Sequence, residues 1–217
     1  MKEKMDMLNG SIWNKLTRYA LPVAATGILG QLFNASDLAI VGNFTGSDST
    51  VAVAAVGANS PVIGLILNFF IGIALGANIV IAHAVGRGDE KTIRKAVNTS
   101  VLMALAGGIA IAVAGEFCIE ALLRLLNIPE DVFPYALLYI KIYLLGMPAI
   151  LLYNFEAAIF RSIGDTKTPL LVLAVSGLLN VALNLFFVIV LDMTVEGVAI
   201  ATAVSNIVSA AIQIHTY

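Results

Sequence analysis

An aspartate, Asp37, lies inside an apolar run that extends from Tyr19 to Val41. A carboxylate in the hydrocarbon of a membrane is costly, so such residues face the interior of a helix bundle or a water-filled cavity. The carboxyl group can bind a cation there, or alternate between its protonated and ionised forms. This placement is typical of proton or cation sites in transporters.

Further polar residues occur in three of the apolar runs. Within each run they are spaced by three or four residues, so they share one face of the helix. The three groups are Asn34 with Asp37, Ser176 with Asn180 and Asn184, and Thr202 with Asn206 and Ser209. A rise of about 1.5 Å per residue places Asp37, Asn184 and Thr202 at a similar depth, in the outer half of the bilayer. Carboxylate, amide and hydroxyl oxygens together suit a hard cation.

These positions predict a cation or proton coupling site made of Asp37, Asn180, Asn184 and Thr202. The secondary candidates are Asn34, Ser176, Asn206 and Glu156. Glu156 lies five residues before Arg161, near the inner end of its span, where it could reach the interface or pair with a base. The alternative for the amides and hydroxyls is a structural role, as hydrogen bonds between packed helices worth about 0.6 kcal/mol each. We expect no metal site beyond a sodium ion at Asp37, and no other cofactor.

Two further patterns concern the helices themselves. Pro22, near the inner end of the first span, removes a backbone hydrogen bond and can bend the helix that carries Asp37. Gly64, Asn68, Gly72 and Gly76 recur every four residues, a stripe that predicts close helix packing.

The composition places the chain in a membrane. Of its 217 residues, 59% are hydrophobic and 12% charged, against about 25% charged in soluble domains. The mean hydropathy is +0.95. Residues 1–217 therefore form one membrane domain, and nothing in them suggests a nucleic-acid partner. No phosphate-binding loop, nucleophile elbow or zinc spacing is present, so an enzyme is not expected.

Six apolar stretches are long enough to cross a bilayer, which takes about 20 residues per helix. The predicted spans are 16–42, 51–85, 96–115, 133–160, 169–191 and 197–217. The segment between the third and fourth spans, from Glu116 to Asn127, is expected to be a short amphipathic piece on the outer surface, ended by Pro129. The predicted fold is an all-α bundle of six transmembrane helices.

The basic residues predict its orientation. They gather before the first span and between the second and third and the fourth and fifth: Lys2, Lys4, Lys15, Arg18, Arg87, Lys91, Arg94, Lys95, Arg161 and Lys167. Lysine and arginine favour the cytoplasmic side of a membrane, so we expect both termini in the cytoplasm. The expected location is the cell membrane.

Several strings, taken in order, resemble the N-terminal lobe of the multidrug and toxic compound extrusion (MATE) transporters. They are Leu21-Pro22, DLAIVG from Asp37, AAVG from Ala54, AVGRGD from Ala84, FRSIGDTKTP from Phe160, NVALN from Asn180 and GVAIATAVSN from Gly197. The likeness covers essentially the whole chain, and the order and spacing of the strings make it specific.

The resemblance implies a secondary exporter of amphipathic, often cationic compounds, coupled to inward flow of protons or sodium. It implies that Asp37 is the coupling residue, with Asn180, Asn184 and Thr202 as polar partners. Members of the family often carry a second aspartate where this chain has Asn184, which leaves its site with one negative charge fewer.

Length is the other departure from the family, whose members normally have two six-span lobes with the substrate cavity between them. The expected partners are membrane lipids, the substrate and a second lobe, either a C-terminal half or a second copy of this chain. Two alternatives remain open at this level: a membrane fragment or interaction partner without transport, and half of a flippase for lipid-linked oligosaccharides.

Overall fold

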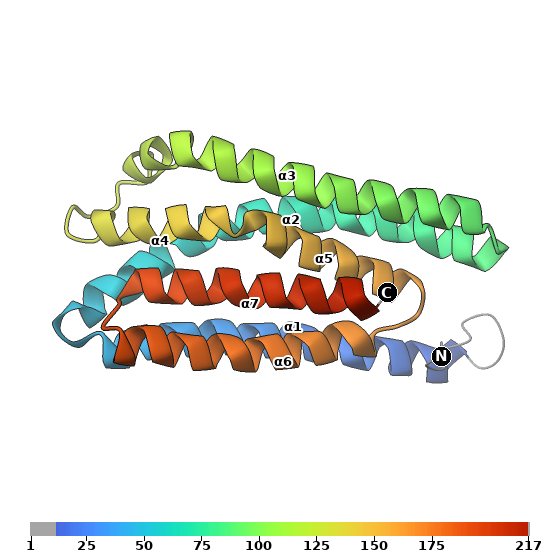
Figure 1. Ribbon diagram of the computed structural model, residues 1–217, viewed down its shortest axis with the longest axis horizontal. Coiled ribbons are helices and arrows are strands. Elements are labelled where there is room, and N and C mark those ends of the chain that lie inside the picture. The colour runs from blue at the N-terminus through green and yellow to red at the C-terminus, as the bar shows by residue number, and fades with distance from the viewer. Residues whose placement is uncertain (1–11, 217) are drawn as a thin grey trace.

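The computed structural model describes residues 12–216, which form a bundle of long helices running back and forth along one axis (Figure 1). The elements are α1 (Ile12–Phe44), the 3₁₀ helix η1 (Gly46–Asp48), α2 (Ser49–Arg87), α3 (Glu90–Leu125), α4 (Phe133–Leu145), α5 (Met147–Ser162), α6 (Lys167–Leu185), the π-helix η2 (Phe186–Val190) and α7 (Val195–Thr216). The described range contains no strand.

The described residues give six spans when α4 and α5 are counted together as one. Five helical segments are each long and apolar enough to cross a membrane, and α4 with α5 forms a sixth, bent by 54°. The predicted all-α bundle of six membrane helices is therefore confirmed. The orientation of its termini stays a prediction, and Lys2 and Lys4 lie outside the described residues.

Short turns join the helices at both ends. Gly88, with a φ of 68°, ends α2 in the left-handed conformation that glycine adopts without strain. Asp89 then caps α3 by accepting hydrogen bonds from the backbone N–H and the hydroxyl of Thr92, which hold the pKa of its carboxyl below the usual range. Asp165 makes the same two contacts with Thr168 before α6.

The two ends of the bundle differ in charge. The turns after Arg87 and Arg161 lie at one end, here named the basic end. The turns that carry Asp48, Glu130 and Asp192 lie at the other, here named the acidic end. Asp37 is nearer to the acidic end, because α1 starts at the basic end and finishes at Phe44.

The prediction of a separate surface segment after Gly115 is wrong, because α3 continues without a break to Leu125. Gly115 sits against the side chain of Leu144, so it serves packing rather than a turn. The charges beyond it are paired along or across helices: Glu120 with Arg124 at 2.9 Å and Glu116 with Lys141 at 3.7 Å. Such pairs let an apparently surface-like sequence remain helical.

The predicted fourth span, 133–160, is two helices rather than one. The break falls at Gly146, followed by Pro148 in the first turn of α5. Proline has no N–H to continue the preceding helix and suits the start of the next. Gly146 also lies against Ala203 of α7, where a β-carbon would come within 2.9 Å of that residue's β-carbon.

The predicted fifth span, 169–191, differs in its outer part. The α-helix ends at Leu185 and η2 follows it, with the N–H of Leu191 bonded to the carbonyl oxygen of Phe186 five residues back. π-turns in membrane helices are rare and recur near functional sites. This one starts two residues after Asn184.

The glycine stripe on α2 does not pack within this bundle. A β-carbon added at Gly64, Gly72 or Gly76 would meet no atom within 4 Å among the described residues. The prediction of close packing is therefore wrong for this chain. The tight helix contact is instead between α3 and α5, where a β-carbon on Gly108 would overlap the backbone of Pro148.

α5 is the centre of the bundle. It packs against α2, α3 and α7, and nearly all of its side chains are buried. Because α5 is held on three sides, the polar residues that it carries have fixed positions. The fourth side of α5 borders the candidate site.

Candidate ion site between α1, α5, α6 and α7

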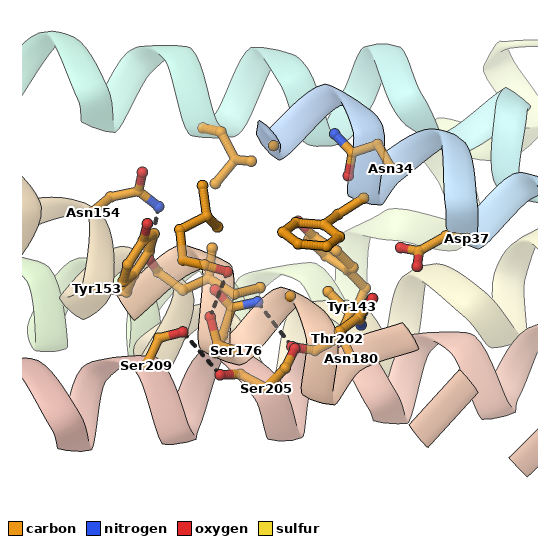
Figure 2. Close-up of a pocket in the computed structure, with 17 residues that line it drawn as sticks. Asn34, Asp37, Tyr143, Tyr153, Asn154, Ser176, Asn180, Thr202, Ser205 and Ser209 are labelled. Atoms are coloured by element: carbon orange, nitrogen blue, oxygen red, sulfur yellow. Dashed lines mark hydrogen bonds between the residues drawn. The ribbon is translucent and has the colours of Figure 1, made fainter. Parts of the chain in front are cut away.

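A partly open cavity of about 180 Å³ lies between α1, α5, α6 and α7 (Figure 2). Its polar lining comprises Asn34, Asp37, Asn154, Ser176, Asn180, Thr202, Ser205, Asn206 and Ser209. The rest of the lining is formed by the aromatic side chains of Phe33, Tyr143 and Tyr153, together with aliphatic residues and glycines. A hollow with this many polar groups inside a membrane domain suits water or an ion.

Asp37 is held in a chain of side-chain hydrogen bonds that crosses three helices. The Nδ2 of Asn184 donates to the Oδ1 of Asp37 at 2.6 Å and to the Oδ1 of Asn180 at 3.2 Å. The Nδ2 of Asn180 in turn donates to the hydroxyl of Thr202 at 3.4 Å. The structure thus brings together the four residues that the sequence grouped by depth.

All of these groups except Thr202 are nearly withdrawn from solvent. The exposed fractions are 8% for Asp37, 6% for Asn180 and 0% for Asn184. An isolated carboxylate in such surroundings must be protonated, paired or bound to a cation. No basic side chain lines the cavity.

Asn184 also offers an oxygen that nothing occupies. Its Oδ1 is buried and has no hydrogen-bond partner among the described residues. A buried acceptor without a partner costs about 1–3 kcal/mol, which a cation or a water molecule would recover. In the present arrangement the nitrogen of Asn184 faces Asp37, and Asn184 does not line the cavity. The site carries carboxylate, amide and hydroxyl oxygens, which are ligand types that suit sodium, although the amide of Asn184 would have to turn to offer its oxygen to an ion at Asp37.

The local sequence explains how α1 and α6 come close enough to share the site. Gly177 stands directly against the ring of Phe33, and any side chain there would overlap that ring. Asn180 and Asn184 follow at three and seven residues along α6, so one face of α6 carries the contact glycine and both amides.

The secondary candidates divide into two groups. Asn34, Ser176 and Asn206 line the cavity, although the hydroxyl of Ser176 and the amide of Asn206 bond to backbone carbonyls of their own helices. Glu156 does not line it. Its side chain is buried, with Oε2 lacking a partner among the described residues, while the Nε of Arg161 binds the carbonyl oxygen of Ala157.

Pro22 lies within α1, which continues through it as one helix. The hydroxyl of Thr26 donates a hydrogen bond to the backbone carbonyl oxygen of Pro22 at 2.8 Å. A functional bend at Pro22 stays a prediction, as does the coupling role of each site residue.

Four lining residues with polar atoms in their side chains were not part of the sequence-based grouping: Tyr143, Tyr153, Asn154 and Ser205. Ser205 could have been found, since it lies four residues before Ser209 on the same helix. Asn154 and the two tyrosines could not, because their direction depends on the bend at Gly146.

The fold and the buried polar cluster around Asp37 define a class: multi-pass membrane proteins of the MATE transporter fold. A crystal structure of a MATE protein in the bent conformation superposes with a TM-score of 0.89 at 24% identity, over 98% of this chain and 47% of that one. The MatE family model matches residues 22–186, and the chain belongs to this family.

Two relatives from Bacillus subtilis, both described as probable multidrug resistance proteins, are similar over most of this chain. YpnP is 30% identical over 201 residues, which is 93% of this chain and 44% of YpnP. YoeA is 32% identical over 203 residues, which is 91% of this chain and 43% of YoeA. The chain spans about half the length of the curated relatives it matches, and it is a half-length lobe of the MATE type.

Proposed function

We propose that this chain is one lobe of an ion-coupled exporter in the cell membrane, and that Asp37 carries the coupling ion. The observation behind the proposal is the buried contact between Asp37 and Asn184, next to an amide oxygen with no partner. The names of the two B. subtilis relatives support multidrug compounds, amphipathic or cationic, as the substrate class.

The proposed cycle follows from the cost of a buried charge. With a proton or sodium ion bound, the site is neutral and the helices around it can pack closely. When the ion leaves, the bare carboxylate of Asp37 draws water or polar groups to itself, which favours a different arrangement of α1 against α6. Asn184, Asn180 and Thr202 would hold sodium by their oxygens, and they would hold a protonated Asp37 by hydrogen bonds.

The cavity is smaller than a typical site for a drug-sized ligand, which supports the proposal that substrate binding requires a second lobe. Drug-sized ligands occupy sites of about 300–1,000 Å³, whereas the cavity here measures about 180 Å³. We therefore propose that the lobe itself holds the ion, and that the substrate binds between this lobe and a second one, either another copy of this chain or a C-terminal half. The basic end is proposed to face the cytoplasm.

The direct test is ion binding by the purified chain in lipid nanodiscs. Infrared difference spectra of the unchanged chain should contain a carboxyl band that responds to sodium or to pH and that is missing from the spectra of Asp37→Asn, while the bands of the other carboxyls remain. Glu156→Gln is the matched control: it removes another buried carboxyl, outside the cavity, and should leave the response intact. Retention of the response in Asp37→Asn would contradict the proposed ion site.

The coupling itself is tested in vesicles that contain this lobe and its partner lobe. An imposed proton or sodium gradient should drive export of a fluorescent cationic dye, and Asp37→Asn should reduce the export to the rate without a gradient. Gradient-driven export at the full rate in Asp37→Asn would exclude the coupling role.

A further inference from the structure

A row of polar side chains extends from the Asp37 site along α7 toward the basic end. The hydroxyl of Ser205 donates to the carbonyl oxygen of Thr202 at 3.0 Å, and the hydroxyl of Ser209 donates to that of Ser205 at 3.0 Å. Both serines line the cavity, and Ser176 of α6 lines it with them (Figure 2). At about 1.5 Å per residue, the seven residues from Thr202 to Ser209 cover about 10 Å.

The cavity beside this row has room for water. Its volume of about 180 Å³ exceeds that of several water molecules, and buried waters occur where polar groups can bond to them. Each serine hydroxyl uses its single proton on a backbone carbonyl and keeps lone pairs that can accept from water. The row therefore presents acceptors to whatever fills the cavity.

Gln213 is the next polar residue along this row. It follows Ser209 by one helical turn on the same face of α7 and lies three residues before Thr216, so it stands between the cavity and the basic end. Its side chain is 0% exposed, and neither Oε1 nor Nε2 has a hydrogen-bond partner among the described residues.

An apolar side chain would seal this position at lower cost. Buried apolar residues such as Val172 and Ala210 occur in this part of α6 and α7, and a buried amide left without partners is destabilising. An amide can, however, donate to one water molecule and accept from another. It can therefore stand between water on its cavity side and water at the basic end.

We propose that Ser176, Ser205, Ser209 and Gln213, here named the polar row, form a hydrated route between the Asp37 site and the basic end, closed at Gln213 in this structure. The proposal rests on the proposed function in one respect: the ion that uses the route is the one bound at Asp37. Hydration of the row and its closure by Gln213 do not depend on coupling.

The route is tested by the reactivity of single cysteines toward a small, charged, membrane-impermeant thiol reagent. Ser209→Cys is made in the Cys118→Ala background and reconstituted as the full chain in sealed vesicles, with the reagent added in turn to each side. Ile207→Cys on the same helix is the control, since Ile207 does not line the cavity and its apolar side chain is 55% exposed on the outside of the bundle. Lys167→Cys and Glu130→Cys report which side is the basic end and which the acidic end.

We expect Ser209→Cys to react from the basic end at least about tenfold faster than Ile207→Cys, because a thiol in apolar surroundings forms little of the reactive thiolate. Gln213→Ala should accelerate the reaction further by opening the row. Gln213→Asn, which keeps the amide on a shorter side chain, should give an intermediate rate and covers the case in which the alanine variant does not fold.

Three results would overturn the proposal: a rate for Ser209→Cys no higher than that for Ile207→Cys, reaction only from the acidic end, or rates that do not change with either substitution at Gln213. Asp37→Asn separates this proposal from the function of the ion site. If Asp37→Asn removes ion binding while Ser209→Cys stays reactive, the ion site and the hydrated route are both supported. If ion binding survives in Asp37→Asn but Ser209→Cys is reactive, the route stands and the ion site fails.

Discussion

Asn184 is the most distinctive residue of this site, because the nitrogen and the oxygen of its side-chain amide have different surroundings. The nitrogen donates to Asp37 and to Asn180, while the oxygen has no partner among the described residues. The sequence identified Asn184 by its depth in the membrane and by its spacing from Asn180. It could not show that the nitrogen rather than the oxygen faces the carboxylate, since that choice depends on how α1 packs against α6.

A second carboxylate at this position should strengthen cation binding. Asn184→Asp places a negative charge next to Asp37, and two unit charges about 4 Å apart at an effective dielectric constant of about 20 repel by about 4 kcal/mol. A bound cation relieves that repulsion, so sodium affinity should rise at least about tenfold, or one more proton should be retained at neutral pH. Binding of radiolabelled sodium to the purified chain in nanodiscs measures the sodium affinity, and titration of the same sample measures the number of protons retained.

The control for this substitution is Asn43→Asp, which adds the same charge to α1 at an exposed position near the acidic end, where Asn43 bonds only to the carbonyl oxygen of Ala39 in the described structure. It should change neither sodium affinity nor proton retention. If Asn184→Asp behaved like Asn43→Asp, residue 184 would not belong to the ion site.

At the level of the helices, the close contact between α3 and α5 positions the cavity wall. Gly108 meets the backbone of Pro148 directly, at the start of the helix that carries Tyr153 and Asn154 into the cavity. A glycine in an apolar run gave no indication of this. The sequence pointed instead to the glycines of α2, whose four-residue spacing is regular but which face open space in this lobe.

Gly108→Ala should therefore destabilise the bundle, while Gly72→Ala should not. The added methyl group at residue 108 collides with backbone that cannot move aside, which costs about 1–3 kcal/mol, as overpacking of a core does. At residue 72 the methyl group meets no atom within 4 Å, and alanine is the better helix former. Thermal unfolding of both variants in the same detergent gives the comparison; equal transition temperatures would show that the α3–α5 contact has room to relax.

The other errors at this level have a common cause. The bend at Gly146 and the continuation of α3 past Gly115 involve the same residue type, and a sequence does not say which glycine ends a helix. Pro148 marks the first as a break, whereas Leu144 packed on Gly115 and the pairing of Glu116 with Lys141 keep the second helical. Both outcomes depend on contacts with another helix, and the hydrophobic pattern of a single segment does not reveal such contacts.

At the level of the whole molecule, the distribution of charge between the two ends carries the prediction of orientation. The described basic residues Lys15, Arg18, Arg87, Lys91, Arg94, Lys95, Arg161 and Lys167 are all at or near the basic end. Arg124 and Lys141 lie toward the acidic end, where each is close to a glutamate, Glu120 and Glu116 respectively. Because Arg124 and Lys141 are each close to a glutamate, their charges are locally balanced, and they count less toward the orientation than the eight residues at the basic end.

The basic end should thus face the cytoplasm, and single cysteines can test this in intact cells. In the Cys118→Ala background, Glu130→Cys at the acidic end should react with a membrane-impermeant reagent added outside, because Glu130 is an exposed residue of the loop between α3 and α4. Lys167→Cys, exposed at the start of α6, should react only after the membrane is permeabilised. The reverse pattern would invert the bundle and place the Gln213 end of the polar row outside. Gln213 would then control entry of the ion rather than its release, while the Asp37 site, which lies within the bundle in either orientation, would keep the same ligands.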